Sequence, residues 1–207
     1  MRVFHDRRIR ELYKDLLRRH GRPGEGWSLW CKRPKTLREK EEIIIGSILT
    51  QRTSWKNVEL AMARLRQEKI CSIAGLLKNP RKVPQSIRSA GFYNQKSKCL
   101  LRLVRYITRS GGLVNLQKKA LPDLRKNFLE LSGIGPETAD AILLYAFEKP
   151  IFVIDEYTRR LVTAKRITKE RKYEKLQEFF ERNIPRDWRL YQDFHALIVR
   201  EGKLTGR

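Results

Sequence analysis

The chain has 207 residues, 41% of them hydrophobic, which suffices for one compact domain or two small lobes. No run of about 18 apolar residues is present, so no membrane-spanning helix is predicted. The formal net charge is +23, from 46 Lys and Arg against 23 Asp and Glu. Such an excess repels itself unless a polyanion is near, which favours nucleic acid over an anionic membrane surface as partner. The alternative is a basic bias of the source lineage, for example a thermophile.

Cysteine and histidine, two residue types that often bind metals, are few and scattered in this chain. Three cysteines lie far apart without a CxxC pair: Cys31, Cys71 and Cys99. Three cysteines alone cannot build a four-cysteine metal or iron–sulfur site, so we expect buried thiols, no metal and no cofactor.

The histidines also lack a metal-ligand spacing. His5, His20 and His195 are isolated, and each is interpreted as a hydrogen-bonded surface or core group. The first 20 residues are charged throughout and lack the apolar core of a secretory signal, which predicts a cytoplasmic protein, associated with the nucleoid if the source is prokaryotic.

Helical periodicity dominates the chain. A Gly- and Pro-rich linker with two tryptophans (21–30) follows the first helix, and the helix that begins at residue 37 changes from charged to almost wholly apolar, which predicts burial on most sides. Helices are predicted, in order, over 7–20, 37–52, 55–67, 72–79, 83–91, 94–112, 121–134, 136–148 and, as a pair around Pro185, 173–200. No strand alternation of useful length is present. The sequence therefore predicts an all-α protein without internal repeats.

The segment "LSGIGPETAD" (131–140) marks a tight connection between two of these helices. One helix ends in Gly133-Ile134-Gly135, and the next starts at once with Pro136 in its first turn, where the missing N–H costs nothing. Glycines permit positive φ and a close approach of the backbone to another surface. Free N–H groups at the start of the second helix can hold a phosphate without reading sequence.

This pattern predicts a helix-hairpin-helix that anchors a DNA backbone, with Ile134 packed between the two helices. An ordinary helix C-cap is the alternative. The basic composition and the residues downstream favour the anchor.

A carboxylate follows the hairpin at a helix start. Pro150 interrupts the chain, residues 151–154 form a short apolar extended piece, and Asp155 stands at an N-cap position. A capping carboxylate accepts backbone N–H groups and stays ionised with a lowered pKa. In a dry cleft it could stabilise an oxocarbenium-like sugar or orient a water molecule, although a plain N-cap alone also explains it.

At this point three segments, in order, resemble the helix-hairpin-helix–Gly/Pro–Asp superfamily of DNA glycosylases. "ILTQRTSWKNVELAMARL" (48–65) is similar to that family's Gln-containing loop, and "SAGFYNQKSKCLLRL" (89–103) to its Gly-aromatic-Tyr-Asn-x-Lys segment. The third is the hairpin with the Asp155 segment behind it. The similarity covers about 37–165 and, more weakly, 193–203. It is closest to 3-methyladenine DNA glycosylase III, a branch related to endonuclease III.

The resemblance implies a base excision repair fold with two helical lobes and a cleft between them. One lobe would combine 1–36 with 166–207, and the other would span 37–165 and carry the loops, the hairpin and the aspartate. It also implies a monomer that binds double-stranded DNA containing a damaged base.

The same resemblance assigns roles to single residues. Asp155 takes the catalytic position, and Gly133, Ile134 and Gly135 take the DNA-binding hairpin. Gln51 takes the position of the residue that fills the hole left by a flipped nucleotide. The alternative for Gln51 is a helix-terminal polar contact.

Further DNA contacts come from the neighbouring loops. Phe92 takes the position of the wedge on the opposite strand, with a core aromatic as the alternative. Arg52, Lys96 and Lys98 are candidate phosphate contacts.

A base pocket is expected because excision requires the damaged nucleotide to leave the stack. Electron-rich rings would select a cationic alkylated purine by cation–π stacking. Trp55 lies beside the Gln51 loop, and Trp27 and Trp30 in the linker could form the other wall; core packing is the alternative for these two.

Two departures from the family pattern refine the expectation. Lyase-competent members carry a lysine two residues after the second hairpin glycine, where this chain has Glu137, and a carboxylate cannot form a Schiff base. Many relatives also place cluster cysteines near the C-terminal end, where this chain reads "EGKLTGR" (201–207), so no iron–sulfur cluster is expected.

The leading hypothesis is therefore a monofunctional N-glycosylase for alkylated purines such as 3-methyladenine. Two alternatives are an endonuclease III-like glycosylase for oxidised or mismatched pyrimidines, with or without lyase activity, and a non-catalytic helix-hairpin-helix DNA-binding module. The combination of Asp155 with Gln51 and Phe92 disfavours the last.

Overall fold

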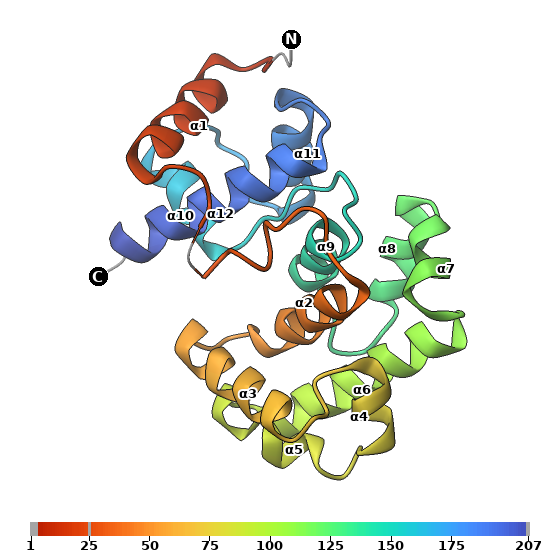
Figure 1. The fold of residues 1–207 in the computed structure, drawn as a ribbon. Helices are drawn as coiled ribbons and strands as arrows, with labels where there is room; N and C mark the ends of the chain where they lie inside the picture. Colours follow the sequence, from red (N-terminus) through yellow and green to blue (C-terminus); the bar gives the residue numbers. More distant parts are fainter. Residues whose placement is uncertain (1–3, 25, 206–207) are drawn as a thin grey trace. The chain divides into compact units, whose positions relative to one another are not determined.

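The structure is a computed structural model that describes residues 4–24 and 26–205 (Figure 1). The helices are α1 (Arg7–His20), α2 (Leu37–Leu49), α3 (Trp55–Gln67), α4 (Ile73–Lys78), α5 (Val83–Ser86), the 3₁₀-helix η1 (Arg88–Ala90), α6 (Tyr93–Arg109), α7 (Gly112–Lys118), α8 (Leu121–Leu129), α9 (Pro136–Tyr145), α10 (Glu156–Ala164), α11 (Tyr173–Asn183) and α12 (Trp188–Thr205). Within these ranges no β-strand is present, so the predicted all-α class is confirmed. None of the described helices is long and apolar enough to cross a membrane.

The chain divides into two compact units. The first combines the described residues up to Arg33 with those from Leu143 onward, and the second spans Pro34–Ile142. The first boundary lies near the one expected after residue 36, but the second lies well before the one expected after residue 165. The reason is that residues 151–154 are buried and that α10 packs on α12, which draws Asp155 into the first unit.

The first unit is organised around α12, on which α1 and α10 pack. Its core is aromatic: the Phe152 and Phe180 rings stack with centroids 4.5 Å apart, and Phe194 meets both edge-on. Arg33 ties the linker to α12, because its Nη2 lies 2.6 Å from Asp193 Oδ1 and also donates to the Arg189 carbonyl.

The second unit is organised around α6, which is contacted by α2, α4, α5 and α7. The predicted burial of the apolar helix is confirmed, since every residue of α2 from Ile43 to Leu49 is buried. The helix starts with a capping box, in which Thr36 and Glu39 satisfy each other's backbone amides, and it ends at Leu49, earlier than expected. Residues 50–54 then form the turn that carries Gln51.

Asp140 and Arg125 join the two helices of the hairpin. Asp140 in α9 is fully buried, and Arg125 in α8 donates to both of its carboxylate oxygens, with Nε to Oδ1 at 2.7 Å and Nη2 to Oδ2 at 3.0 Å. This fork-shaped contact fixes the angle between α8 and α9 on either side of the turn.

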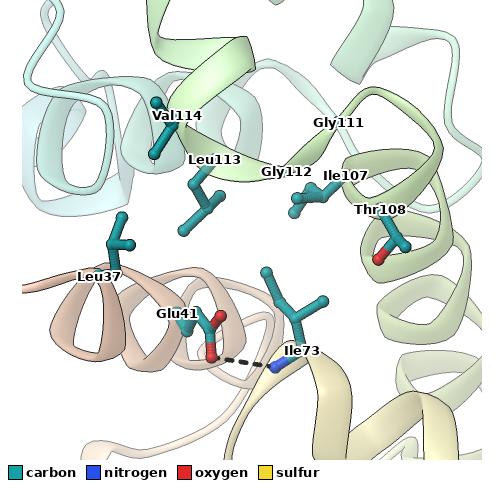
Figure 2. A pocket seen from close by; sticks show the side chains of 9 residues that line it. All are labelled: Leu37, Glu41, Ile73, Ile107, Thr108, Gly111, Gly112, Leu113 and Val114. Carbon is teal, nitrogen blue, oxygen red and sulfur yellow. Dashed lines mark hydrogen bonds between the residues drawn. The ribbon is translucent and has the colours of Figure 1, made fainter.

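A hollow of about 400 Å³ lies elsewhere in the second unit (Figure 2). The side chains around it come from α2, α4, the end of α6 and the start of α7, and Glu41 accepts a hydrogen bond from the Ile73 amide there. Burial raises the pKa of Glu41. None of the site residues expected from the sequence lines this hollow.

Arg125→Met should destabilise the second unit by about 3–5 kcal/mol, because it removes the guanidinium that donates to both oxygens of the buried Asp140 carboxylate. The double variant Arg125→Met with Asp140→Leu should recover most of that loss, since it removes both charges. Urea unfolding of the two variants measures this; equal destabilisation would contradict the role assigned to the pair.

Candidate functional site

The hairpin turn, residues 131–135, connects α8 to α9. Pro136 is the first residue of α9, as expected. Gly133 has a φ of +97°, and a Cβ there would lie 3.0 Å from the Cys99 sulfur, so both backbone conformation and packing require glycine. Ile134 is buried, in line with its expected packing between the helices.

Gly135 is different. Its φ lies outside the left-handed region, and a Cβ there would meet nothing within 4 Å. The chain's own packing therefore does not explain the glycine. An open surface at the start of a helix allows another molecule to approach the backbone closely.

In the turn, two carbonyls accept side-chain hydrogen bonds and two glycine amides stay open. Gln51 Nε2 donates to the Gly133 carbonyl at 3.0 Å, and Arg102 Nη1 donates to the Ser132 carbonyl at 3.0 Å. The Gly133 and Gly135 amides donate no hydrogen bond to any part of the chain that the structure describes, and both residues are exposed. Exposed amides at a helix N-terminus suit an anion such as phosphate.

Gln51 is held against the hairpin. Besides the Gly133 carbonyl, its Nε2 donates to Thr138 Oγ1 at 3.1 Å. Gln51 therefore makes a polar contact, as the alternative interpretation expected. Its partner is the Gly133 carbonyl, 82 residues away in the hairpin turn, and not the end of its own helix. The gap-filling role stays a prediction.

Phe92 is exposed over 61% of its surface, so the core alternative does not hold. It occupies the N-cap of α6 with a φ of +46°, a left-handed conformation that is uncommon for a bulky residue. Strain and an exposed aromatic ring at one position are typical of a contact with another molecule.

The expectation that Lys96 contacts a DNA phosphate is wrong. Lys96 is only 2% exposed, and its Nζ donates to the Leu49 and Ala90 carbonyls, each at 2.8 Å. Burial lowers its pKa to about 8. The lysine fastens the end of α2 to η1, and so holds the loops of Gln51 and Phe92 in place from inside the unit.

The other two basic candidates stay on the surface. Lys98 lies two residues further along α6 and is exposed, and Arg52 is exposed with a φ of +49°. Both remain predicted phosphate contacts.

Asp155 caps α10, as the sequence indicated. Its Oδ1 accepts from the Thr158 amide at 2.7 Å and from Thr158 Oγ1 at 2.8 Å, and the residue is 9% exposed. Burial alone would raise the pKa of this carboxyl, but the nearby His195 imidazole and the two Thr158 donors outweigh burial and lower the pKa. The carboxylate is therefore ionised inside the first unit.

His195 on α12 lies behind this carboxylate. Its Nε2 is 3.4 Å from Asp155 Oδ2, and its Nδ1 is 2.7 Å from the Tyr145 hydroxyl at the end of α9. The imidazole is nearly fully buried.

Trp27 and Trp30 belong to the same cluster. Trp30 is buried, and its ring meets the Tyr145 ring edge-on with centroids 5.2 Å apart. Trp30 is therefore packed in a core, as the alternative interpretation expected. Trp27 is partly exposed, and its ring lies 5.7 Å from Tyr145 and 6.1 Å from His195. Of the two linker tryptophans, only Trp27 keeps open surface for a base.

Trp55 belongs to the second unit. It opens α3, is partly exposed, and its indole N–H donates to Glu59 at 2.7 Å. Glu137 is the second residue of α9, exposed, and acidic in the first turn, where the helix dipole favours it.

The three cysteines are free thiols in separate places, and no group of three or more His, Cys, Asp or Glu side chains among residues 4–24 and 26–205 could hold a metal ion. Burial raises the pKa of Cys71 to about 12 and also raises that of Cys99.

Sequence reasoning interpreted His195 only as a hydrogen-bonded surface or core group, and it missed Tyr145 and the contact of His195 with Asp155. Both Tyr145 and His195 lie in apolar helical segments, where helix periodicity indicates burial but not polar partners. The Asp-x-x-Thr spacing of Asp155 and Thr158 did carry a readable signal, because an N-cap side chain bonds the amide three residues on.

The family model of the HhH-GPD superfamily base excision DNA repair proteins matches residues 45–186, which include the Gln51 turn, the hairpin and Asp155. The chain belongs to this superfamily. It is a DNA glycosylase of base excision repair, and the family resemblance read from the sequence is confirmed.

Three relatives illustrate the match. A Methanocaldococcus jannaschii protein that carries the name DNA repair glycosylase is 38% identical over 200 residues, covering 94% of this chain and 87% of the relative. The H. pylori 3-methyladenine DNA glycosylase, solved with bound 1,N6-ethenoadenine, has a TM-score of 0.77 at 29% identity, with 95% of each chain covered. Endonuclease III of Thermotoga maritima is 26% identical over 162 residues, covering 78% of this chain and 72% of the relative.

Lys96 and Lys98 give a matched pair for testing DNA contacts. Lys98→Met should reduce the slope of log binding constant against log salt by about 1, the value for one lost phosphate contact. Lys96→Met should leave that slope unchanged and lower stability by about 1–3 kcal/mol, since two buried carbonyls lose their donor. Fluorescence anisotropy across a salt series, with thermal unfolding, separates them; a reduced slope in Lys96→Met would restore Lys96 as a DNA contact.

The two hairpin glycines should respond differently to alanine. Gly133→Ala should destabilise the glycosylase by about 1–3 kcal/mol through its left-handed backbone. Gly135→Ala should change stability by less than about 0.5 kcal/mol but weaken DNA binding, because the new methyl group occupies space that a phosphate needs. Unfolding and duplex-binding titrations measure both, and wild-type affinity in Gly135→Ala would contradict the hairpin contact.

Proposed function

We propose that this glycosylase hydrolyses the N-glycosidic bond of an alkylated purine, such as 3-methyladenine, that has been flipped out of double-stranded DNA. The observation that carries the proposal is Asp155, an ionised carboxylate that is almost fully buried, accepts two hydrogen bonds from Thr158 and lies next to His195. A fixed negative charge stabilises a positive charge next to it, and cleavage of the glycosidic bond generates a positive charge on the sugar.

The chemistry needs little acid assistance. When the bond between C1′ and the base nitrogen breaks, its electron pair leaves with the base, and a cationic alkylated purine departs as a neutral molecule. The sugar becomes oxocarbenium-like, Asp155 stabilises that charge, and the oxygen of a water molecule then bonds to C1′ and releases a proton to solvent.

An aromatic surface near the carboxylate supports the choice of substrate. Trp27 is partly exposed and contacts His195, the neighbour of Asp155. An indole face attracts a cationic base more strongly than a neutral one. Similarity over the full chain to the H. pylori 3-methyladenine glycosylase points the same way.

The absence of a lysine at position 137 supports a monofunctional, water-using reaction. Glu137 occupies the place at which lyase-competent members carry an amine, and a carboxylate cannot form the Schiff base on which strand cleavage depends. The alternative, an endonuclease III-like enzyme for oxidised or mismatched pyrimidines, draws on similarity to endonuclease III of Thermotoga maritima.

A base-release assay on duplexes with methylated, oxidised or mismatched bases should find release of methylated purines. Asp155→Asn should lower the rate by about 10²–10³-fold, since the amide lacks the charge that stabilises the sugar cation. Borohydride should trap no covalent DNA adduct. Release confined to pyrimidine lesions, or a trapped adduct, would favour the endonuclease III-like alternative.

The pH dependence follows from the lowered pKa of Asp155. The carboxylate is ionised at every pH above its lowered pKa. It loses its charge only as the pH falls through that pKa, which lies below the usual Asp value of about 3.9. Single-turnover base release should therefore show no limb from Asp155 between about pH 5 and pH 8. A limb in that range that disappears in Asp155→Asn would contradict the ionised state assigned here.

A further inference from the structure

His195 occupies a position from which it can control the carboxylate of Asp155. The imidazole is 5% exposed, and its two nitrogens face two different groups. Nδ1 lies 2.7 Å from the Tyr145 hydroxyl, whereas Nε2 lies 3.4 Å from Asp155 Oδ2 and makes no hydrogen bond of regular geometry to any described residue.

The protonation of Nε2 follows from its surroundings. An ionised carboxylate only accepts hydrogen bonds, so a bare Nε2 lone pair would face an anion and be repelled. A proton on Nε2 turns the same 3.4 Å contact into an attraction. Nε2 is therefore protonated as long as Asp155 is ionised.

Tyr145 lets the other nitrogen carry a proton or not. Its hydroxyl lies 3.3 Å from the Gln192 carbonyl as well as 2.7 Å from Nδ1. When the hydroxyl donates to Nδ1 the ring is neutral, and when it donates to the carbonyl its oxygen accepts from Nδ1–H and the ring is cationic. Burial raises the pKa of Tyr145 well above its usual value. The nearby Cys31, Asp155 and Asp193 raise it further and outweigh the opposite effect of Arg33, so the phenol keeps its proton.

We propose that His195 is a positioning residue of the reaction: its Nε2–H faces Asp155 Oδ2, and together with the two Thr158 donors on Oδ1 it holds the buried carboxylate ionised and fixed in orientation. This rests on the proposed function of Asp155. His195 is 5% exposed and faces Asp155, so we assign it an action through that carboxylate. Its contribution should therefore fall on the chemical step and not on DNA binding.

Variants of His195 can separate its two nitrogens. Gln places an amide N–H near the position of Nε2, and Asn places one near that of Nδ1. His195→Leu and His195→Asn should lower the single-turnover rate at neutral pH by about tenfold or more, with DNA affinity little changed. Without the imidazole, burial raises the pKa of Asp155, so the acid limb should move toward neutral pH. His195→Gln should restore most of the rate and the wild-type limb.

His20 provides the matched control. It also lies in the first unit, its side chain is only 8% exposed, and its Nε2 lies 2.7 Å from a carboxylate oxygen of Glu201. His20→Leu removes the same kind of pair away from Asp155. It should lower thermal stability and leave the acid limb where it is.

A spectroscopic readout is independent of activity. Long-range ¹H–¹⁵N spectra of the imidazoles in the intact protein should show the His195 Nε2 protonated at every pH at which the protein is folded and Asp155 is ionised. A neutral ring with its proton on Nδ1 would overturn the proposal. This measurement also decides the matter if His195→Leu fails to fold.

The kinetic outcomes distinguish a failure of the proposed function from a failure of the role assigned to His195. A base-release rate that survives Asp155→Asn would remove the proposed function itself. Loss of activity in Asp155→Asn, combined with an unchanged rate and acid limb in both His195→Leu and His195→Asn, would remove only the role of His195.

Discussion

An anion inside a protein persists only where fixed dipoles and charges replace the water that it has lost. Asp155 meets this condition with three neighbours: the Thr158 amide and hydroxyl on one oxygen, and the His195 imidazole near the other. Several elements of the first unit contribute to this arrangement. Asp155 stands at the N-cap of α10, and α12 supplies the histidine and packs on α10. Tyr145, which contacts Trp27 and Trp30, lies against the imidazole.

The second unit presents groups that suit contact with another molecule. Its hairpin turns carbonyls toward Gln51 and Arg102 and leaves glycine amides exposed, while Phe92 stands out at the start of α6. The Lys96 amine joins the segments that carry Gln51 and Phe92 through two backbone carbonyls. A buried amine is suited to this task because one group can donate to several carbonyls at once.

Local features were predictable from the sequence, and long-range ones were not. Pro136 at a helix start and Asp155 as a cap follow from preferences that act over a few residues, and both were read correctly. Lys96 was misread because one helical position among basic neighbours does not reveal which face is buried. The His195–Asp155 contact joins residues on separate helices 40 positions apart, and periodicity carries no information on such pairs.

The hydrogen bonds of the Gln51 side chain bear on how the protein meets damaged DNA. The side-chain amide already satisfies two acceptors of the hairpin, at Gly133 and Thr138. If Gln51 fills the gap left by a flipped nucleotide, as the family resemblance predicts, it must exchange these partners for the edge of an orphaned base. Such an exchange is close to neutral in free energy, because hydrogen bonds are made as others are lost. The decision to insert would then depend on whether an empty space exists, so intact DNA would leave the glutamine where it rests.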